Sequence, residues 1–295
     1  SSSSSSAPAS DTSPAENGVA GRANAQANPR MVVSTAMTEY DDDDEAEAAY
    51  RQAIIIKPKS SNAYYNLGLI FYELKELQKA RLAKRQVVLV TNLTNGLNKL
   101  LYPFENNEEN FINNEAKIAL STDKPREIET DEGPLFLNIF NPPLRLFIIG
   151  AVHIAQKLAP MAAATAYDVT VIDPRRSFGS EFRFPGVALD DRWPDEALES
   201  LDPDRRSAIV TLTHDAKLDD PALKSALKSD VFYIGALGST RTKAKRQDRL
   251  VEAGFSTDEI SRIHGPVGWD IGAQSPAEIA ISIMAELTAT LRRKQ

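Results

Sequence analysis

A strand, a glycine turn and a helix are indicated by residues 147 to 162, FIIGAVHIAQKLAPMA, as at the start of a nucleotide-binding unit. In the dinucleotide fingerprint G-x-G-x-x-G, the first glycine makes the turn, the second lets the backbone approach a pyrophosphate, and the third lets helix pack on strand. Gly150 keeps the turn and Ala155 is small enough for the packing. Val152 replaces the second glycine and disfavours a nicotinamide dinucleotide, although an anion can still bind at the helix N-terminus.

An acidic residue follows the next apolar run at the distance expected of a ribose-binding carboxylate, about 20 residues past the glycine turn. This residue is Asp173, and a cap of the turn beside Pro174 is an equally good interpretation of it. Arg175 lies next to it and would suit a phosphate.

A second glycine turn, GALGSTRTKAKR at residues 235–246, is better suited to phosphate. Its glycines free the backbone, its hydroxyls can cap a helix, and its cations lie in the first turn of that helix. Cations there oppose the helix dipole unless an anion lies between them, which favours a binding role. The candidate residues are Gly235, Gly238, Ser239, Thr240, Arg241, Thr242 and Lys243.

The three histidines of the chain also follow predicted strands. His153 ends the first turn, His214 precedes Asp215 after a third strand, and His264 opens a further turn. None shows the i, i+3 or i+4 spacing that places two metal ligands on one helix face, so we expect hydrogen-bonding or proton-handling roles and no metal. The candidate ligand-binding residues here are Ala151, His153, His214, Asp215, His264, Gly265, Gly268 and Asp270, and we assign no catalytic residue.

Four continuous apolar runs, LRLFII, DVTVID, SAIVTLT and DVFYIG, alternate with helical segments at residues 221–228 and 240–253. Strands that are buried on both faces and alternate with helices predict a parallel, doubly wound sheet. We therefore expect a Rossmann-like α/β domain over residues 142–295. Ligands bind off the carboxyl ends of the strands in this architecture, which is where the candidate residues lie.

The preceding sequence divides into three segments. Residues 1–44 are rich in small and polar types and end in an acidic run, so we expect them to be disordered. Residues 45–81 resemble a tetratricopeptide-repeat helix pair, with Tyr50 and Pro58 in one repeat and Tyr64, Gly68 and Ala80 in the next. They are either a fragment of a repeat array or a working interaction groove. Residues 82–141 contain the short runs RQVVLVTNL, AKIALST and PLFLNIF and predict a small β-rich domain.

The overall composition of the chain excludes several classes of function. The formal net charge of −7 over 295 residues argues against a nucleic-acid partner. The absence of cysteine excludes disulfides and thiolate chemistry and suits a reducing compartment. No apolar run reaches the roughly 20 residues that span a bilayer, and no basic-then-apolar leader is present. We therefore expect a soluble, cytoplasmic protein.

Six ordered motifs resemble the Rossmann domain of the XdhC/CoxI family, the accessory factors of xanthine dehydrogenase and related molybdenum hydroxylases, over about residues 141–292. They are PPLRLFIIGAVHIAQKLAPMA, VTVIDPRRSF, RFP, LTHDAKLDDPAL, FYIGALGSTRTKAKR and RIHGPVGWDIGAQSPAEIAISIMAE. The resemblance implies a chaperone, rather than an enzyme, that binds molybdenum cofactor (molybdopterin), presents it for sulfuration and delivers it to an apo-dehydrogenase. It further implies a cysteine desulfurase partner and a homodimer.

The resemblance also accounts for Val152 in place of glycine. Molybdopterin in its simple form ends in one phosphate, so the turn needs no room for a second phosphate. The chain departs from the family pattern at Lys243 and Trp269, where histidine and leucine are usual, and it lacks the cysteine of longer members. Two other classes stay open. An NAD(P)-dependent oxidoreductase would place Asp173 on the ribose, and an interaction scaffold would act through the repeat-like segment.

Overall fold

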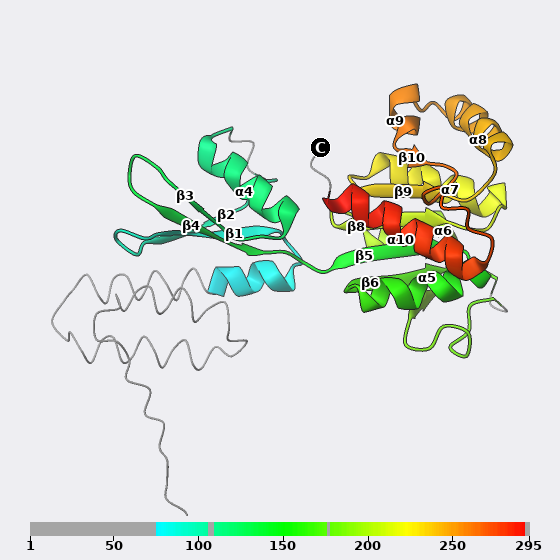
Figure 1. The fold of residues 1–295 in the computed structure, drawn as a ribbon, viewed down its shortest axis with the longest axis horizontal. Coiled ribbons are helices and arrows are strands. Elements are labelled where there is room, and N and C mark those ends of the chain that lie inside the picture. Colours follow the sequence, from blue (N-terminus) through cyan, green and yellow to red (C-terminus); the bar gives the residue numbers. More distant parts are fainter. Residues whose placement is uncertain (1–74, 106–108, 176–177, 293–295) are drawn as a thin grey trace, which may run out of the picture.

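The computed structural model describes residues 75–105, 109–175 and 178–292. A small antiparallel sheet is followed along the chain by a larger parallel sheet with helices on both faces (Figure 1). The predicted α/β class is confirmed by the larger sheet, and the smaller sheet is antiparallel. The expected disorder at 1–44 and nearly all of the repeat-like pair at 45–81 lie outside the described residues, and residues 75–82 are helical.

The larger sheet has six parallel strands in the order β10-β9-β8-β5-β6-β7. Counted along the chain, this is the 3-2-1-4-5-6 order of dinucleotide-binding folds, in which the strand order reverses beside the first strand. All four predicted strands are present, with two short ones added at the edges. Their bounds are β5 Leu144–Ile149, β6 Tyr167–Ile172, β7 Ala188–Asp190, β8 Ser207–Thr211, β9 Tyr233–Ala236 and β10 Ile263–His264.

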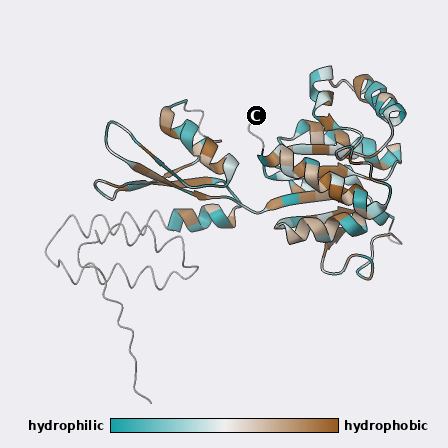
Figure 2. Cartoon of the chain, in the orientation of Figure 1, coloured by the Kyte–Doolittle hydropathy of each residue, from teal (hydrophilic) through white to brown (hydrophobic). Residues whose placement is uncertain are grey.

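Two apolar layers enclose this sheet because successive side chains of each strand point to opposite faces. Leu146 and Ile148 pack in one buried cluster with α5 (His153–Ala164) and α10 (Pro276–Arg292). Phe147 and Ile149 pack on the other face with α6 (Pro194–Leu201), α7 (Ala216–Lys228), α8 (Thr240–Glu252) and α9 (Thr257–Ser261). The strands are accordingly the most apolar layer of this part (Figure 2). Within the described ranges, no helix has the length and apolar character needed to cross a membrane.

The smaller sheet is antiparallel, in the order β2-β1-β4-β3. Its strands are β1 (Val87–Asn92), β2 (Asn98–Leu101), β3 (Arg126–Ile128) and β4 (Leu135–Phe140), and α4 (Phe111–Thr122) packs on one face. The prediction of a strand at AKIALST was wrong, because these residues form the second half of α4. Asn110 caps that helix, and Asn113, Ala116 and Leu120 are buried at helical spacing.

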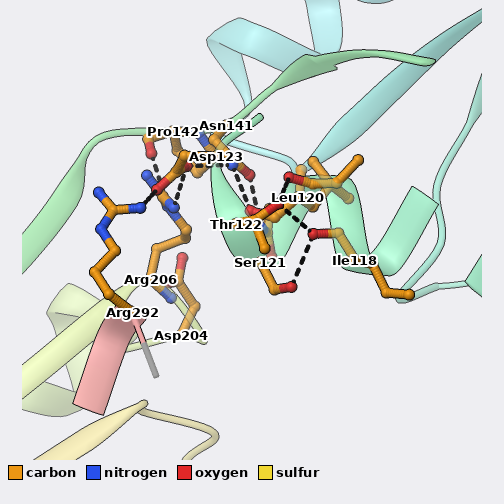
Figure 3. Close-up of polar contacts among 12 residues, drawn as sticks. Ile118, Leu120, Ser121, Thr122, Asp123, Asn141, Pro142, Asp204, Arg206 and Arg292 are labelled. Atoms are coloured by element: carbon orange, nitrogen blue, oxygen red, sulfur yellow. Dashed lines mark hydrogen bonds and ion pairs between the residues drawn. The ribbon is translucent and has the colours of Figure 1, made fainter. Parts of the chain in front are cut away.

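One acidic residue links the two parts (Figure 3). Asp123 ends α4 in a left-handed conformation, with φ at 52°. Its carboxylate accepts hydrogen bonds from Arg206 and Arg292 of the larger part, each at 2.8 Å, and from the Asn141 amide at 2.6 Å. Arg206 also donates to the Pro142 carbonyl at 3.0 Å. The short connection at residues 141–143 is therefore held by charge-assisted bonds on both sides.

Candidate functional site

The first glycine turn follows β5 and needs glycine at its first position. Gly150 has φ at +105°, and a Cβ there would lie 2.4 Å from the Thr213 Cγ2 atom. Ala155 is fully buried, in agreement with its predicted packing role. Val152 occupies the N-cap of α5 and offers no side-chain cap. The turn is therefore built as in a dinucleotide fold except where the second phosphate contact would be made.

Asp173 closes this turn from the end of β6. Its carboxylate accepts the Ala151 backbone N–H at 2.8 Å and two side-chain bonds from Arg175, each at 2.8 Å, together with the Arg175 backbone N–H at 3.0 Å. Burial alone would raise the pKa of Asp173, but these hydrogen bonds hold it below its ordinary value. Of the two interpretations of Asp173, the geometry is that of a turn cap. A carboxylate thus holds one backbone amide of the first turn.

A pocket of about 560 Å³ lies beside this carboxylate, between the ends of β6 and β7. Carboxylates and small or apolar side chains line it together, and two of the carboxylates are already paired with Arg175 and Arg192. The lining residues are Val171, Asp173, Gly179, Leu189, Asp190 and Asp191.

The end of β8 carries the predicted His214–Asp215 pair. His214 has φ at +60°, and Asp215 caps α7 by accepting the Lys217 N–H at 2.9 Å. Thr213 donates from its hydroxyl to the buried Asp219 at 2.7 Å. Burial raises the pKa of Asp219, an effect that the Thr213 hydroxyl opposes. Asp219 was not predicted from the sequence, because an acidic residue in the first turn of a helix is common.

The second glycine turn begins at the end of β9, and packing at Gly235 and backbone conformation at Gly238 explain its glycines. A Cβ on Gly235 would lie 2.5 Å from Val267 Cγ2, while Gly238 has φ at +143°. Ser239 caps α8 by accepting the Thr242 N–H at 3.3 Å. Among the described residues, the side chains of Arg241 and Lys243 form no hydrogen bond or ion pair, in contrast to Arg175 at the first turn.

The turn after β10 is anchored by a residue that the sequence interpretation missed. Glu286 of α10 accepts the Tyr233 hydroxyl at 2.6 Å, contacts His264 Nδ1 at 2.9 Å and accepts the Gly268 N–H at 2.7 Å. The His264 ring stacks on Tyr233 with centroids 4.8 Å apart. Burial would raise the pKa of Glu286, but the bonds from His264, Tyr233 and Gly268 lower it. Asp270 of the same turn accepts the Gly272 N–H at 3.4 Å.

The strand register brings the candidate residues to one edge of the sheet. Backbone bonds run in a continuous row from β7 to the last turn, joining Asp173 to Asp190, Gly150 to Ile172, Leu212 to Ile149, Leu237 to Thr211 and Val267 to Ala236. The three histidines lie along this edge, at the start of α5, after β8 and in β10. Throughout the described ranges, no group of three or more His, Cys, Asp or Glu residues is arranged to hold a metal.

Comparisons with known proteins match this architecture. The family model of the XdhC Rossmann domain matches residues 146–287, and that of a TPR repeat matches residues 41–75. The molybdenum cofactor insertion chaperone PaoD of Escherichia coli is 34% identical over 150 residues, which are 51% of this chain and 41% of that protein. A probable xanthine dehydrogenase subunit of Bacillus subtilis is 32% identical over 160 residues, which are 54% of this chain and 46% of that protein.

A solved structure described as a xanthine dehydrogenase from Bacillus halodurans aligns with a TM-score of 0.55 at 25% identity, covering 75% of this chain and 67% of that one. The chain spans less than half the length of the two curated relatives named above. The family match coincides with the six-stranded sheet, its helices and all three turns at its carboxyl edge. Residues 146–287 of this chain match the XdhC Rossmann domain.

Proposed function

We propose that this chain is an accessory factor that binds molybdenum cofactor and assists maturation of a xanthine dehydrogenase-type molybdenum hydroxylase. The XdhC Rossmann domain and the similarity to a molybdenum cofactor insertion chaperone support this function. The apo-hydroxylase is the expected partner, in the cytoplasm, with a cysteine desulfurase as the sulfur donor and a homodimer as the assembly. The protein acts by binding and transfer rather than as an enzyme.

One observation favours this function over that of a nicotinamide-dependent oxidoreductase. The two turns at the sheet edge differ in what they offer an anion: Asp173 occupies the Ala151 amide of the first turn, whereas Arg241 and Lys243 of the second turn have no partner among the described residues. A ligand with a single terminal phosphate is satisfied by the second turn alone. A pyrophosphate would lie beside the Asp173 carboxylate, which already holds the Ala151 N–H.

The proposed binding edge consists of the candidate residues predicted from the sequence. The second turn, from Gly235 to Lys243, would hold the phosphate end of the cofactor. The first turn, Asp173 and the His264–Asp270 turn would bound the ring system. Molybdopterin supplies the dithiolene sulfurs that ligate molybdenum, and the side chains of this edge would orient the cofactor and exclude water.

A direct titration tests this proposal. We expect the full chain, titrated anaerobically, to bind molybdenum cofactor saturably, as followed by fluorescence of its two tryptophans, Trp193 and Trp269. Lys243→Ala should weaken binding about tenfold, because one charge-assisted bond contributes ~1.5 kcal/mol or more. Val152→Gly should leave NAD(H) binding weak, since Asp173 still occupies the turn. Tight NAD(H) binding that Val152→Gly strengthens would instead support the oxidoreductase.

A further inference from the structure

Of the three histidines, His264 has a ring that the fold holds in place. Its Nδ1 lies 2.9 Å from Glu286 Oε1, and its ring stacks on Tyr233. Within the part of the chain that the structure describes, the rings of His153 and His214 form no hydrogen bond or ion pair. An imidazole that is held both at one nitrogen and on one face has a fixed orientation, which a ligand-binding histidine needs.

The Glu286 carboxylate determines which nitrogen of His264 carries the proton. Oε2 accepts the Tyr233 hydroxyl and the Gly268 N–H, and burial raises the pKa of Tyr233, so that its hydroxyl keeps its proton and donates. Burial opposes ionisation of Glu286, but its three hydrogen bonds outweigh burial and lower its pKa. An ionised carboxylate only accepts, so Nδ1 must donate to Oε1. In the neutral ring, Nε2 therefore carries a lone pair and no proton.

The lone pair on Nε2 is available to a ligand. Nε2 has no partner among the described residues, and it is not enclosed, since the His264 side chain is 35% exposed. His264 is paired in parallel register with Gly235, the first residue of the second glycine turn. The two residues are thus about one strand spacing apart, or about 4.8 Å. Beside a turn that offers cations to a phosphate, His264 offers an acceptor.

We propose that His264 is the residue of this edge that accepts a hydrogen bond, at Nε2, from a heterocyclic N–H group of the bound ligand. Glu286 is the positioning residue, because it keeps the proton on Nδ1. The pterin ring of molybdenum cofactor carries such N–H groups, and for that ligand the inference rests on the proposed function. A ligand that combines a phosphate with an N–H-bearing ring would then be recognised at both ends.

Glu286→Gln tests the assignment because it should invert the tautomer of His264. The Tyr233 hydroxyl and the Gly268 N–H still require an acceptor, so the amide oxygen takes the place of Oε2 and the amide NH₂ group takes the place of Oε1. That group donates to Nδ1 and leaves the proton on Nε2. We expect ¹H–¹⁵N correlation spectra of the full chain at pH 8 to show His264 protonated at Nδ1 in the wild type and at Nε2 in Glu286→Gln.

The same variant should weaken binding of molybdenum cofactor about tenfold or more, because a donor then faces the donor of the ligand. His264→Phe, which keeps an aromatic ring on Tyr233 without the lone pair, should lose about tenfold. Glu278→Gln is the matched control, since it makes the same change at an exposed position of α10. It should change the affinity by less than about twofold.

A wild-type ring protonated at Nε2, or an inverted tautomer with unchanged cofactor affinity, would overturn the proposal. If Glu286→Gln does not fold, His264→Phe decides, and unchanged affinity in that variant would overturn it. Free pterin, which lacks phosphate and metal, separates the two proposals. A chain in which pterin shifts the His264 Nε2 resonance but to which molybdenum cofactor does not bind would support the acceptor and overturn the proposed function. Binding of neither would overturn both.

Discussion

Replacing Asp173 with alanine should lower the free energy of unfolding by about 3 kcal/mol, because breaking a buried ion pair by removing one partner is strongly destabilising. The carboxylate is 1% exposed and satisfies two backbone N–H groups as well as the Arg175 guanidinium. Arg175 is partly exposed and can be rehydrated, so most of the loss comes from the orphaned amides of the turn. Urea unfolding of the full chain at pH 7 measures it.

Asp190 provides a matched control, because its carboxylate forms the same kind of ion pair, with Arg192 two residues later. Among the described residues it accepts no bond from a backbone N–H farther along the chain. Asp190→Ala should cost about 1 kcal/mol. Because the pKa of Asp173 is lowered on folding, its contribution is present above its ordinary pKa of 3.8 and is lost as the pH falls through the lower folded value. Equal losses for the two variants at pH 7, or a loss for Asp173→Ala that grows in acid, would contradict this role.

Replacing Glu286 with alanine should cost a similar amount, about 3 kcal/mol, and should release the turn after β10. Three partners lose their acceptor at once: the Tyr233 hydroxyl, the His264 ring and the Gly268 amide. Hydrogen exchange at the Gly268 amide reports the release of the turn, and urea unfolding reports the loss of stability.

Tyr233→Phe is the control for Glu286, because it removes one of the three bonds and leaves the ring stacked on His264. It should cost about 1 kcal/mol and leave the Gly268 amide protected. If the Gly268 amide exchanges no faster in Glu286→Ala than in the wild type, Glu286 does not anchor the turn.

The sequence predicted the elements of the larger sheet well because buried parallel strands are short, continuous apolar runs. LRLFII and SAIVTLT are bounded by turn residues and leave little ambiguity. The prediction of a strand at AKIALST failed because a short apolar run cannot be assigned to a strand or a helix by periodicity alone. Two signals identify the helix: Asn110 as its cap, upstream of AKIALST, and the helical spacing of Ala116 and Leu120.

The candidate site was predictable only in part, for a physical reason. Residues that follow strands fall at the carboxyl edge of a parallel sheet, so topology alone places Gly150, Asp173 and His264 there. Their partners come from elsewhere in the fold. Glu286 is 22 residues from His264, in a helix whose spacing indicates only packing. Arg246 looks like one more surface cation in TKAKR, and only the tertiary structure buries it.

Delivery of molybdenum cofactor to an apo-hydroxylase is the decisive test of the proposed function. An apo-form of a xanthine dehydrogenase-type hydroxylase would be incubated with limiting molybdenum cofactor, alone or with the full chain, and the rate and yield of active enzyme compared. We expect that the wild-type chain raises both, that Lys245→Ala does the same, and that Lys243→Ala loses most of the effect. Equal activation with and without the chain, at cofactor concentrations well below saturation, would contradict it.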